Sequence, residues 1–331
     1  MNYRALTGTG LKIPRLSLGT MMFGGQTDEA DSLGMIHYAL DQGINVIDTA
    51  DVYNNGVTES IVGKAIEGLR DKVILVTKFG ASMGSGPNDS GLSRFHTIQA
   101  CENSLRRLKT DYIDIYYMHW PDDSCPLDET LEATTQLVKS GKVRYIAVSN
   151  FASWQVCKSL WLSEKNHYIA PICNQVVYNL LQRDIERELL PCLRDLNVGL
   201  AVFNPLAGGL LTGKHQRGIP QGTNRFSIGQ KSGAASLGKV YSDRYWTEAN
   251  FNAIDSYTKI ADQEGITLLE LSLRWIISQS QIDMILVGAS KKDQLKQNID
   301  LLDKPILSTE VLKACDQVYQ ELVGIRFKYN R

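Results

Sequence analysis

The sequence lacks an excess of either charge. Its 331 residues include 35 Lys and Arg against 36 Asp and Glu, which gives a formal net charge of −1. Proteins that bind nucleic acid through its phosphate backbone, or that lie on an anionic membrane, usually carry a basic excess. We therefore expect neither nucleic acid nor a membrane as a partner, while a local cationic pocket for one anionic ligand remains open.

Long hydrophobic runs are also missing. The longest candidate, residues 198–211, contains Asn204 and Pro205 and falls short of the ~20 apolar residues that a membrane-spanning helix needs. The N-terminus, MNYRALTGTG, has no apolar segment typical of a secretory signal. These two features agree with the cytoplasmic location that the cysteines predict.

The cysteines form no CxxC pair and have no histidine at metal-binding spacing. The six are Cys101, Cys125, Cys157, Cys173, Cys192 and Cys315. A disulfide framework would be unusual in a chain of this length, so we expect reduced, mostly structural thiols and no metal site.

What the sequence does contain is a recurring alternation of short apolar runs and amphipathic segments of helical length. The apolar runs cover residues 16–18, 45–48, 73–78, 113–119, 143–149, 172–176, 199–204 and 284–287. Helical segments between them include residues 29–42, 97–108, 127–140 and 185–196. Apolar strands that alternate with helices are typical of a buried parallel sheet. Eight such runs in one undivided chain predict a closed (β/α)8 TIM barrel of the α/β class.

Three segments fall outside this alternation. Residues 3–14, with Gly8 and Gly10 between two short extended runs, predict a β-hairpin that could close the floor of the barrel. Residues 205–246, after the seventh strand, are rich in Gly and Ser and too long for an ordinary connection, so we expect a functional loop. Residues 303–331 form a C-terminal extension whose helix begins near Ser308. We expect all of these within a single domain, residues 1–331.

Chemically distinctive side chains fall at the carboxyl ends of three successive predicted strands. Asp48 ends the second, Lys78 the third and His119 the fourth, and Tyr53 follows Asp48 by five residues. Active sites of such barrels lie at the carboxyl ends of the strands. We therefore expect these four side chains to converge above the barrel mouth.

The four side chains suit transfer of a proton to a carbonyl oxygen. A phenol has a pKa near ~10, so Tyr53 needs a neighbouring ammonium that lowers its pKa before it can act as an acid. Lys78 would supply that charge and Asp48 would hold Lys78, while His119 would orient the carbonyl as a neutral donor. With no metal-ligand set and no Ser-His-Asp order, an external hydride donor or an electrophile is required.

Each of the four also has a structural explanation when taken alone. Asp48 could form a turn or a helix cap, Tyr53 could be a loop aromatic, and His119 could be a satisfied core histidine. A buried Lys78 is harder to explain in this way, because burying an unpaired ammonium is costly. Their occurrence together at strand ends favours the functional explanation.

Three long segments are specific enough to indicate a family. Residues 43–63 begin GINVIDTADVY, residues 105–121 read LRRLKTDYIDIYYMHWP, and residues 141–151 read GKVRYIAVSNF. In this order they resemble the signatures of the aldo-keto reductase superfamily, and the resemblance covers essentially the whole chain. It implies a catalytic tetrad of the same four residues, Asp48, Tyr53, Lys78 and His119.

The resemblance also implies a site for a nicotinamide dinucleotide. Residues expected near the nicotinamide are Gly19, Thr20, Met21, Asp48, Ser149, Asn150, Gln175 and Phe203. Residues expected near the pyrophosphate are Asn204, Leu206, Gly208, Lys214 and Arg225. Residues expected near the adenosine and its phosphate are Gly288, Ser290, Lys292, Gln294 and Asn298. Backbone donors at a helix start with a nearby lysine would form a sensible anion site.

Two departures from the family pattern bear on the cofactor. Phe203-Asn204 stands where relatives often have Tyr-Ser, and Phe203 can still stack on the nicotinamide ring. Many relatives have an arginine where this chain has Ser290 or Gln294. Because lysine matches a phosphate less well than arginine does, NADP(H) is the expected cofactor with NAD(H) as the alternative.

The expected reaction is NAD(P)H-dependent reduction of a small aldehyde or ketone. Met21, Met22, Phe79 and Trp120 are candidates to line the substrate cleft, or else they pack the top of the barrel. One rival function is a Schiff-base aldolase that uses Lys78 as the nucleophile. The other is a non-catalytic regulator like the channel β subunits that share this fold and cofactor site; those relatives carry an N-terminal extension, whereas this sequence begins at the hairpin.

Overall fold

The computed structural model describes residues 2–218, 226 and 235–325. The chain divides into two compact units. The first contains residues 1–176, 185–203 and 281–299, and the second contains residues 177–184, 204–280 and 300–331.

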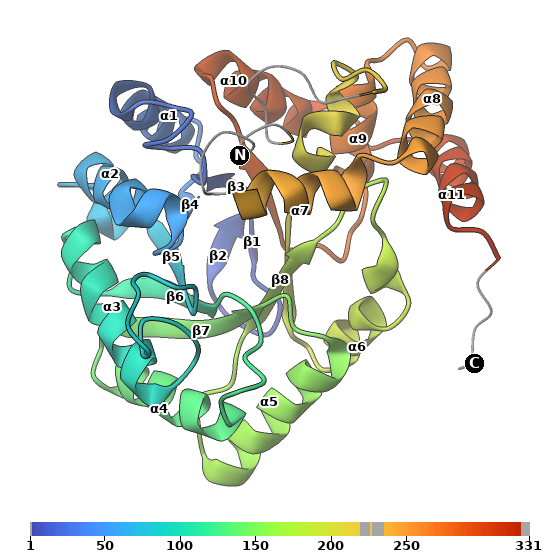
Figure 1. Ribbon diagram of the computed structural model, residues 1–331. Helices are drawn as coiled ribbons and strands as arrows, with labels where there is room; N and C mark the ends of the chain where they lie inside the picture. Colours follow the sequence, from blue (N-terminus) through green and yellow to red (C-terminus); the bar gives the residue numbers. More distant parts are fainter. Residues whose placement is uncertain (1, 219–225, 227–234, 326–331) are drawn as a thin grey trace. The chain divides into compact units, whose positions relative to one another are not determined.

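The first unit holds a closed barrel of parallel strands, in the order β10-β3-β4-β5-β6-β7-β8-β9 (Figure 1). The strands are β3 (Leu16–Gly19), β4 (Val46–Asp48), β5 (Ile74–Phe79), β6 (Ile113–Met118), β7 (Val143–Ser149), β8 (Cys173–Val177), β9 (Gly199–Phe203) and β10 (Met284–Gly288). Each strand overlaps one of the apolar runs, and every residue of β5 and β6 is buried. Strands covered on both faces are continuously apolar, which is why the sequence predicted the TIM barrel correctly.

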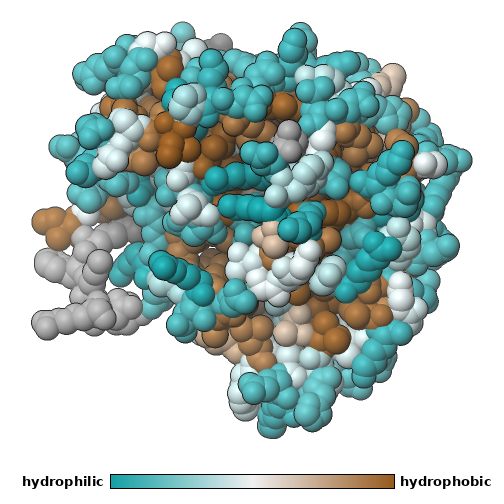
Figure 2. Space-filling model, turned by 180° about the vertical axis from the view of Figure 1, so that it is seen from behind, coloured by the Kyte–Doolittle hydropathy of each residue, from teal (hydrophilic) through white to brown (hydrophobic). Residues whose placement is uncertain are grey.

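Helices of the first unit surround the strands (Figure 1). They are α1 (Glu29–Asp41), α2 (Val57–Ala65), α3 (Arg94–Leu108), α4 (Leu127–Lys139), α5 (Ser153–Asn166), α6 (Leu189–Asp195) and α10 (Lys292–Asp300). In α1, Met35, Ile36 and Ala39 are buried at helical spacing, and the Asp28 side chain caps the helix by accepting a hydrogen bond from the Asp31 N–H. Over the face drawn in Figure 2, hydrophilic and hydrophobic side chains are interspersed.

Helix α6 is shorter than the segment 185–196 that the sequence predicted. A 3-10 turn, η3 (Asp184–Glu186), comes first, and α6 begins only at Leu189. Pro191 then falls in the first turn, where its missing N–H costs nothing, whereas a helix from residue 185 would place it in the interior.

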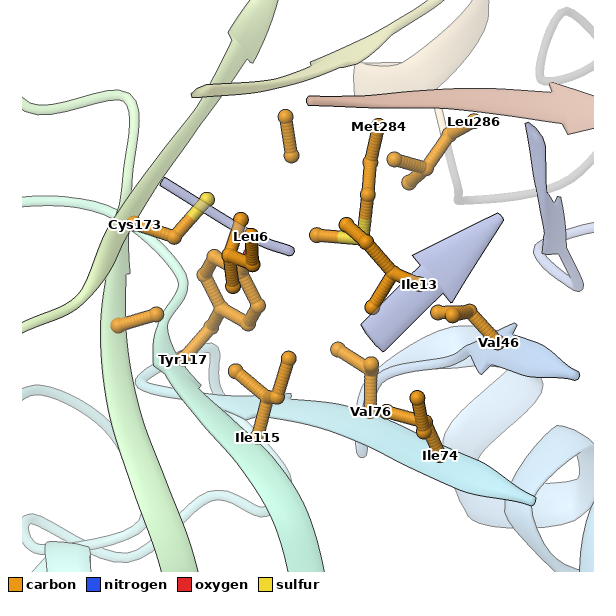
Figure 3. Packing of buried hydrophobic residues seen from close by; sticks show 12 residues of the cluster. Leu6, Ile13, Val46, Ile74, Val76, Ile115, Tyr117, Cys173, Met284 and Leu286 are labelled. Carbon is orange, nitrogen blue, oxygen red and sulfur yellow. The ribbon is translucent and has the colours of Figure 1, made fainter. Parts of the chain in front are cut away.

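The expected hairpin is present as β1 (Tyr3–Ala5) and β2 (Lys12–Pro14), which pair antiparallel. Its Leu6 and Ile13 are fully buried in a cluster with side chains of the strands, as Figure 3 shows. Thr7 donates a hydrogen bond of 2.9 Å to Asp283, directly before β10. The hairpin therefore lies at the amino ends of the strands, where the sequence placed it.

The second unit contains four helices among its described residues. They are α7 (Ala235–Tyr245), α8 (Glu248–Gln263), α9 (Leu268–Ile277) and α11 (Thr309–Val323), together with the 3-10 turns η4 (Ala207–Thr212) and η5 (Leu301–Asp303). Helix α8 packs on α11 and on α9. The Ser308 side chain accepts a hydrogen bond from the Val311 N–H at the start of α11, which confirms the extra C-terminal helix.

The segment expected to be a loop, residues 205–246, contains α7 and η4 in its described part. Tyr241 and Tyr245 of α7 are buried one helical turn apart, and their burial stabilises a helix of weak intrinsic propensity. The Gly and Ser content concealed this helix in the sequence. Of the helices the structure describes, none is long and apolar enough to cross a membrane.

Candidate active site

The site is assembled at the carboxyl ends of adjacent strands in the first unit. Asp48 is the last residue of β4, Lys78 is the penultimate residue of β5, and His119 directly follows β6. The His119 N–H donates to the Phe79 carbonyl at 2.9 Å, which extends the strand pairing beyond β6. Because the strands are parallel and in register, the three side chains share one edge of the barrel.

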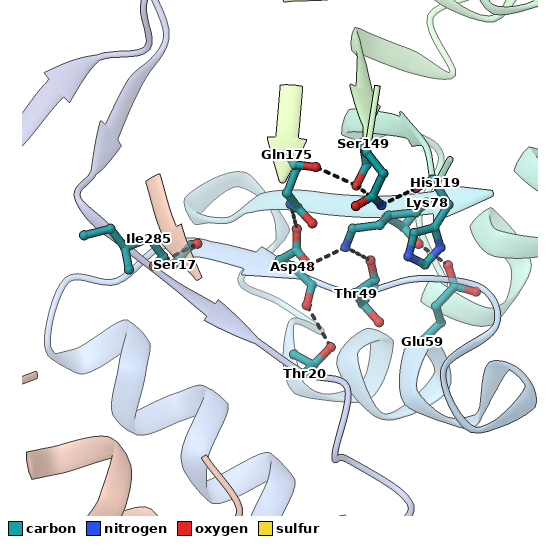
Figure 4. Close-up of polar contacts among 12 residues, drawn as sticks. Ser17, Thr20, Asp48, Thr49, Glu59, Lys78, His119, Ser149, Gln175 and Ile285 are labelled. Carbon is teal, nitrogen blue, oxygen red and sulfur yellow. Dashed lines mark hydrogen bonds and ion pairs between the residues drawn. The ribbon is translucent and has the colours of Figure 1, made fainter. Parts of the chain in front are cut away.

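A buried ion pair forms the centre of the site (Figure 4). The Lys78 ammonium donates a hydrogen bond to Asp48 Oδ1, and both side chains are almost completely buried. Lys78 Nζ also donates to the Thr49 carbonyl at 2.9 Å. The second carboxylate oxygen, Oδ2, accepts a hydrogen bond of 2.8 Å from Gln175 Nε2. Asp48 is thus held from two sides and cannot rotate without losing both partners.

Tyr53 lies beside this ion pair at the start of the 3-10 turn η1 (Tyr53–Gly56). Its ring centroid is 5.4 Å from Lys78 Nζ, and its side chain is half-buried. Burial lowers the pKa of Lys78, but the Asp48 carboxylate and the hydrogen-bonded Tyr53 hydroxyl outweigh it, so the pKa is raised overall. Lys78 is therefore a permanent ammonium at neutral pH.

His119 is buried and neutral. Burial, followed by the nearby Lys78 charge, holds its pKa well below the usual value of 6.5. Its ring meets Tyr53 edge-on, with the centroids 6.0 Å apart, and lies 4.0 Å from the Trp120 ring. Among the described residues, Nδ1 of His119 has no hydrogen-bond partner. The structure thus brings together the four predicted side chains, with the imidazole ring edge-on to the phenol ring.

The residues expected near the nicotinamide continue along the same edge. Ser149 ends β7 and donates from Oγ to the Gln175 carbonyl at 2.8 Å. The exposed Asn150 has a left-handed backbone (φ 61°) and donates from Nδ2 to the His119 carbonyl at 3.0 Å. Thr20 donates from Oγ1 to the Asp48 carbonyl at 2.9 Å. Asn150, Gln175 and Thr20 therefore hydrogen-bond directly to residues of the tetrad, and Ser149 is joined to it through Gln175 and Asn150.

Gly19 and Gly288 pair with each other at the ends of β3 and β10. Met21 follows β3 and is half-buried, and Phe203 is half-buried at the end of β9. The N–H and Oγ of Ser290 both donate to Gln294 Oε1, each at 3.1 Å. The structure therefore places Ser290 and Gln294 at the start of α10, where they are hydrogen-bonded to each other.

Two further members of the expected adenosine group lie on α10. Lys292 is exposed, with Nζ 5.0 Å from the Tyr38 ring centroid. Asn298 is buried on the same helix. Lys292 is therefore an accessible cation at this helix start, next to the exposed Lys291.

Four expected pyrophosphate residues belong to the second unit. Asn204 is buried, donates from Nδ2 to the Tyr245 hydroxyl at 2.9 Å and accepts from the Gly208 N–H at 2.6 Å. Leu206 is half-buried, Gly208 has a positive φ of 70°, and Lys214 is exposed. Arg225 lies outside the described residues. The Asn204 side chain thus fixes the turn that η4 begins.

The candidate substrate residues separate into two groups. Met22 and Phe79 are buried, and Phe79 stacks on Tyr116 with the ring centroids 4.5 Å apart. Burial of this kind favours the packing alternative for Phe79. Met21 is half-buried, and Trp120 is 42% exposed.

Trp120 lines a cleft of about 610 Å³ between the loops that follow β5 and β6. The charged residues of this cleft are Asp122, Asp123 and Glu129. No Lys or Arg lines it, so the cleft is acidic.

Sequence reasoning missed Asp51, which lies between Asp48 and Tyr53. Asp51 is fully buried, and its carboxyl oxygens have no hydrogen-bond partner among the residues described. Burial, and next the nearby Glu59 carboxylate, raise the pKa of Asp51 to about 8. Glu59 itself accepts from Thr77 Oγ1 at 2.6 Å and pairs with Arg107. The one sequence signal for Asp51 is its place within the DTADVY segment. Its burial could not be predicted, because burial depends on the tertiary fold.

In the described part of the chain, no three His, Cys, Asp or Glu side chains are grouped to hold a metal ion. The side chains at the strand ends offer a phenol, an ammonium and a neutral imidazole.

Comparison with known proteins gives similarity over almost the whole chain. A probable voltage-gated potassium channel subunit beta of Arabidopsis thaliana is 33% identical over 97% of this chain and 97% of its own. An L-glyceraldehyde 3-phosphate reductase of Escherichia coli is 33% identical over 96% of this chain and 92% of its own. An aflatoxin B1 aldehyde reductase member 2 of Rattus norvegicus is 34% identical over 96% of this chain and 87% of its own.

The similarity to the Arabidopsis protein spans 97% of that relative, so the expected N-terminal extension does not separate the two. The family model described as the aldo/keto reductase family matches residues 15–320, which include all four strand-end residues. This match confirms the resemblance inferred from the three sequence segments. The chain belongs to the aldo/keto reductase family.

Proposed function

We propose that this protein reduces an aldehyde or ketone to an alcohol with a nicotinamide cofactor, and that Tyr53 is the general acid. Family membership supports NAD(P)H-dependent carbonyl reduction as the class of reaction. The observation that carries the role of Tyr53 is its position beside the buried Lys78–Asp48 pair.

The Lys78 ammonium stabilises the phenolate that forms when Tyr53 gives its proton to the carbonyl oxygen. Tyr53 raises the pKa of Lys78, so the two groups favour each other's ionised forms. Asp48 keeps Lys78 charged despite its burial, and Gln175 keeps Asp48 oriented. Tyr53 is half-buried, so part of its side chain is exposed.

His119 orients the carbonyl. A neutral imidazole can donate one hydrogen bond to the carbonyl oxygen without competing with Tyr53 as a proton source. The strongly lowered pKa fits this role, because it keeps the imidazole neutral. Donation to the oxygen also stabilises the negative charge that develops there.

A nicotinamide cofactor would supply the hydride. The residues that would hold its carboxamide are Ser149 and Asn150 at the end of β7 and Gln175 on β8, which offer hydroxyl and amide groups beside the tetrad. At the start of α10, the cationic Lys292 and the amide of Gln294 suit a phosphate. These residues favour NADP(H), and NAD(H) remains the alternative because no arginine is present among them.

The Schiff-base aldolase is disfavoured by the same geometry. A lysine nucleophile must lose its proton, and its pKa is normally lowered for that purpose. Lys78 instead has a raised pKa, and its ammonium donates to both Asp48 and the Thr49 carbonyl.

A regulatory role is the second candidate function, because two relatives are named as probable voltage-gated potassium channel subunits beta. Such a role does not require turnover, so activity is the measurement that separates the two.

The test is Tyr53→Phe, with Tyr168→Phe as a matched control at a half-buried tyrosine beyond the end of α5. Oxidation of NADPH by a panel of aldehydes would be measured, with cofactor binding followed by fluorescence quenching. We expect Tyr53→Phe to lower kcat by about 10²- to 10⁴-fold while cofactor binding and the control are unchanged. Near-normal turnover in Tyr53→Phe would overturn the assignment, and inactivity of the native protein with every carbonyl would favour the regulator.

A further inference from the structure

Cys157 and Cys192 lie side by side on the outside of the first unit. Cys157 is on α5 and is exposed, while Cys192 is on α6 and is half-buried. Their Sγ atoms are 3.7 Å apart, and both thiols are free. The two residues are 35 positions apart in the sequence, so a search for CxxC spacing does not find the pair.

The pair is a dithiol without further ligands. Cys192 Sγ also points to the Ser153 carbonyl at 3.9 Å. In the described ranges no third His, Cys, Asp or Glu joins the two thiols in a metal-binding group. This composition suits thiol chemistry between the two sulfurs better than it suits a metal ion, which needs more ligands.

The distance is short enough for a covalent bond between the two helices. A disulfide has an S–S length near 2.05 Å, so the sulfurs must approach by about 1.7 Å. Side-chain rotation at two residues on packed helices provides movements of this size.

We propose that Cys157 and Cys192 are a reversible redox-modification site, which hydroperoxides convert into a disulfide that ties α5 to α6. The Cys157 thiolate attacks one oxygen of the peroxide and becomes a sulfenic acid, and the other oxygen leaves as water or an alcohol. Cys192 then attacks that sulfur, the S–O bond breaks, and the hydroxyl leaves as water. The two thiols lose two electrons and two protons, and the peroxide gains them.

The order of the two steps follows from exposure. Cys157 meets solvent directly, whereas burial, the adjacent Cys157 and the carboxylates of Asp195 and Glu188 raise the pKa of Cys192 to about 11. Cys192 therefore acts second, as the resolving thiol, and the resolving step should accelerate as pH rises because it needs the thiolate.

The disulfide would hold a helix that lines another cavity of the first unit. Trp154, Gln155 and Lys158 surround Cys157 on α5 and line a cavity together with Asp122 and Pro126. Tying α5 to α6 restrains the helix that carries these residues.

The experiment treats the reduced full chain with hydrogen peroxide, alkylates the remaining thiols and maps the peptides by mass spectrometry. We expect loss of two alkylatable thiols, a linked peptide that joins positions 157 and 192, and recovery of both thiols with dithiothreitol. Cys157→Ser and Cys192→Ser should each abolish the linked peptide. Cys125→Ser, at a half-buried cysteine whose Sγ contacts Pro126 and Thr130, should leave it intact.

Phenylarsine oxide gives a second measurement that needs no oxidant, because one arsenic binds two neighbouring thiols. The native chain and Cys125→Ser should bind one equivalent, and Cys157→Ser should lose that binding. Sulfinic acid at Cys157 without a linked peptide, a link only between two molecules, or arsenical binding that survives Cys157→Ser would overturn the proposal. Neither readout uses reductase activity, so the result is independent of the proposed function.

Discussion

The ammonium of Lys78 and the carboxylate of Asp48 form a buried ion pair between adjacent barrel strands, and the amide of Gln175 holds the second carboxylate oxygen. Both side chains are almost completely buried, so bulk solvent does not compensate either charge. Burying two charges is stabilising only while both are present, since removal of one leaves the other uncompensated.

Asp48→Asn should therefore lower both stability and turnover. We expect a loss of about 3–5 kcal/mol in the free energy of unfolding, the usual cost of breaking a buried pair. Turnover should fall because Lys78 no longer has the partner that keeps it charged beside Tyr53. Urea unfolding and kcat are the measurements.

The exposed pair Glu29–Lys64 provides the matched control for this change. Glu29→Gln should cost at most about 1 kcal/mol, because exposed pairs are well screened by solvent. Equal losses for Asp48→Asn and Glu29→Gln would contradict the importance of burial at this site.

Asp51 should make stability depend on pH. Its pKa is raised from 3.8 to about 8 by burial and by the Glu59 carboxylate, so the folded protein holds a proton that the unfolded chain releases. A raised pKa stabilises the fold fully below about pH 4, and the contribution is lost as pH rises toward 8 and beyond. Asp51→Asn, which keeps the neutral shape, should remove this dependence.

The measurement is the thermal midpoint of the native chain and of Asp51→Asn between about pH 5 and pH 9. The two curves should converge at low pH, and the variant should become relatively more stable as pH rises. Asp123→Asn, at a carboxylate of the cleft, is the control and should follow the native curve. Parallel curves for the native chain and Asp51→Asn would mean that Asp51 is already ionised in the fold.

Asp48 and Asp51 also show what the sequence reveals and what it conceals. The barrel followed from continuous apolar runs, and the site followed from the rule that parallel strands share a carboxyl edge. That rule places Asp48, the last residue of its strand, in the site. It does not predict that the carboxyl group of Asp51, three residues later, is buried without a hydrogen-bond partner among the described residues.

Other features depend on contacts that no local pattern encodes. Helix α7 is stabilised by burial of Tyr241 and Tyr245, although its composition favours a loop. The thiols of Cys157 and Cys192 meet only because α5 and α6 pack together. In each case tertiary packing determines the structure, and the periodicity of the sequence does not predict that packing.

Gln294→Arg should shift the cofactor preference toward NADPH. Gln294 Oε1 accepts from Ser290 at the start of α10, so the side chain is already directed to that helix terminus. A guanidinium there would offer two parallel donors to a phosphate. We expect about tenfold tighter binding of NADPH relative to NADH, or about 1.4 kcal/mol.

Fluorescence titration with both cofactors measures this preference. Gln297→Arg adds the same charge to an exposed position of α10 and is the matched control. If both variants improve NADPH binding equally, the effect comes from general charge and not from a phosphate site at Ser290 and Gln294.

The acidic cleft beside Trp120 should discriminate against anionic carbonyl compounds. Asp122, Asp123 and Glu129 line it without any basic residue. Burial alone would raise the pKa of Asp122, but hydrogen bonds from Ser124 and the Leu92 N–H lower it below its usual value, so this carboxylate is charged at neutral pH. Asp122 and Glu129 also accept backbone hydrogen bonds, whereas Asp123 can be replaced with less risk to the loops.

Asp123→Asn should therefore raise kcat/KM for 4-carboxybenzaldehyde and leave benzaldehyde unchanged. Two charges a few ångströms apart in water interact by about 1 kcal/mol, so the expected gain is about three- to tenfold at low ionic strength. The gain should shrink as salt is added, because screening weakens the repulsion. Asp71→Asn removes the same charge from an exposed position in the turn η2 (Arg70–Lys72), outside the cleft, and should change neither substrate. An equal improvement for both aldehydes, or one that salt does not reduce, would show that Asp123 acts through the shape of the cleft and not through its charge.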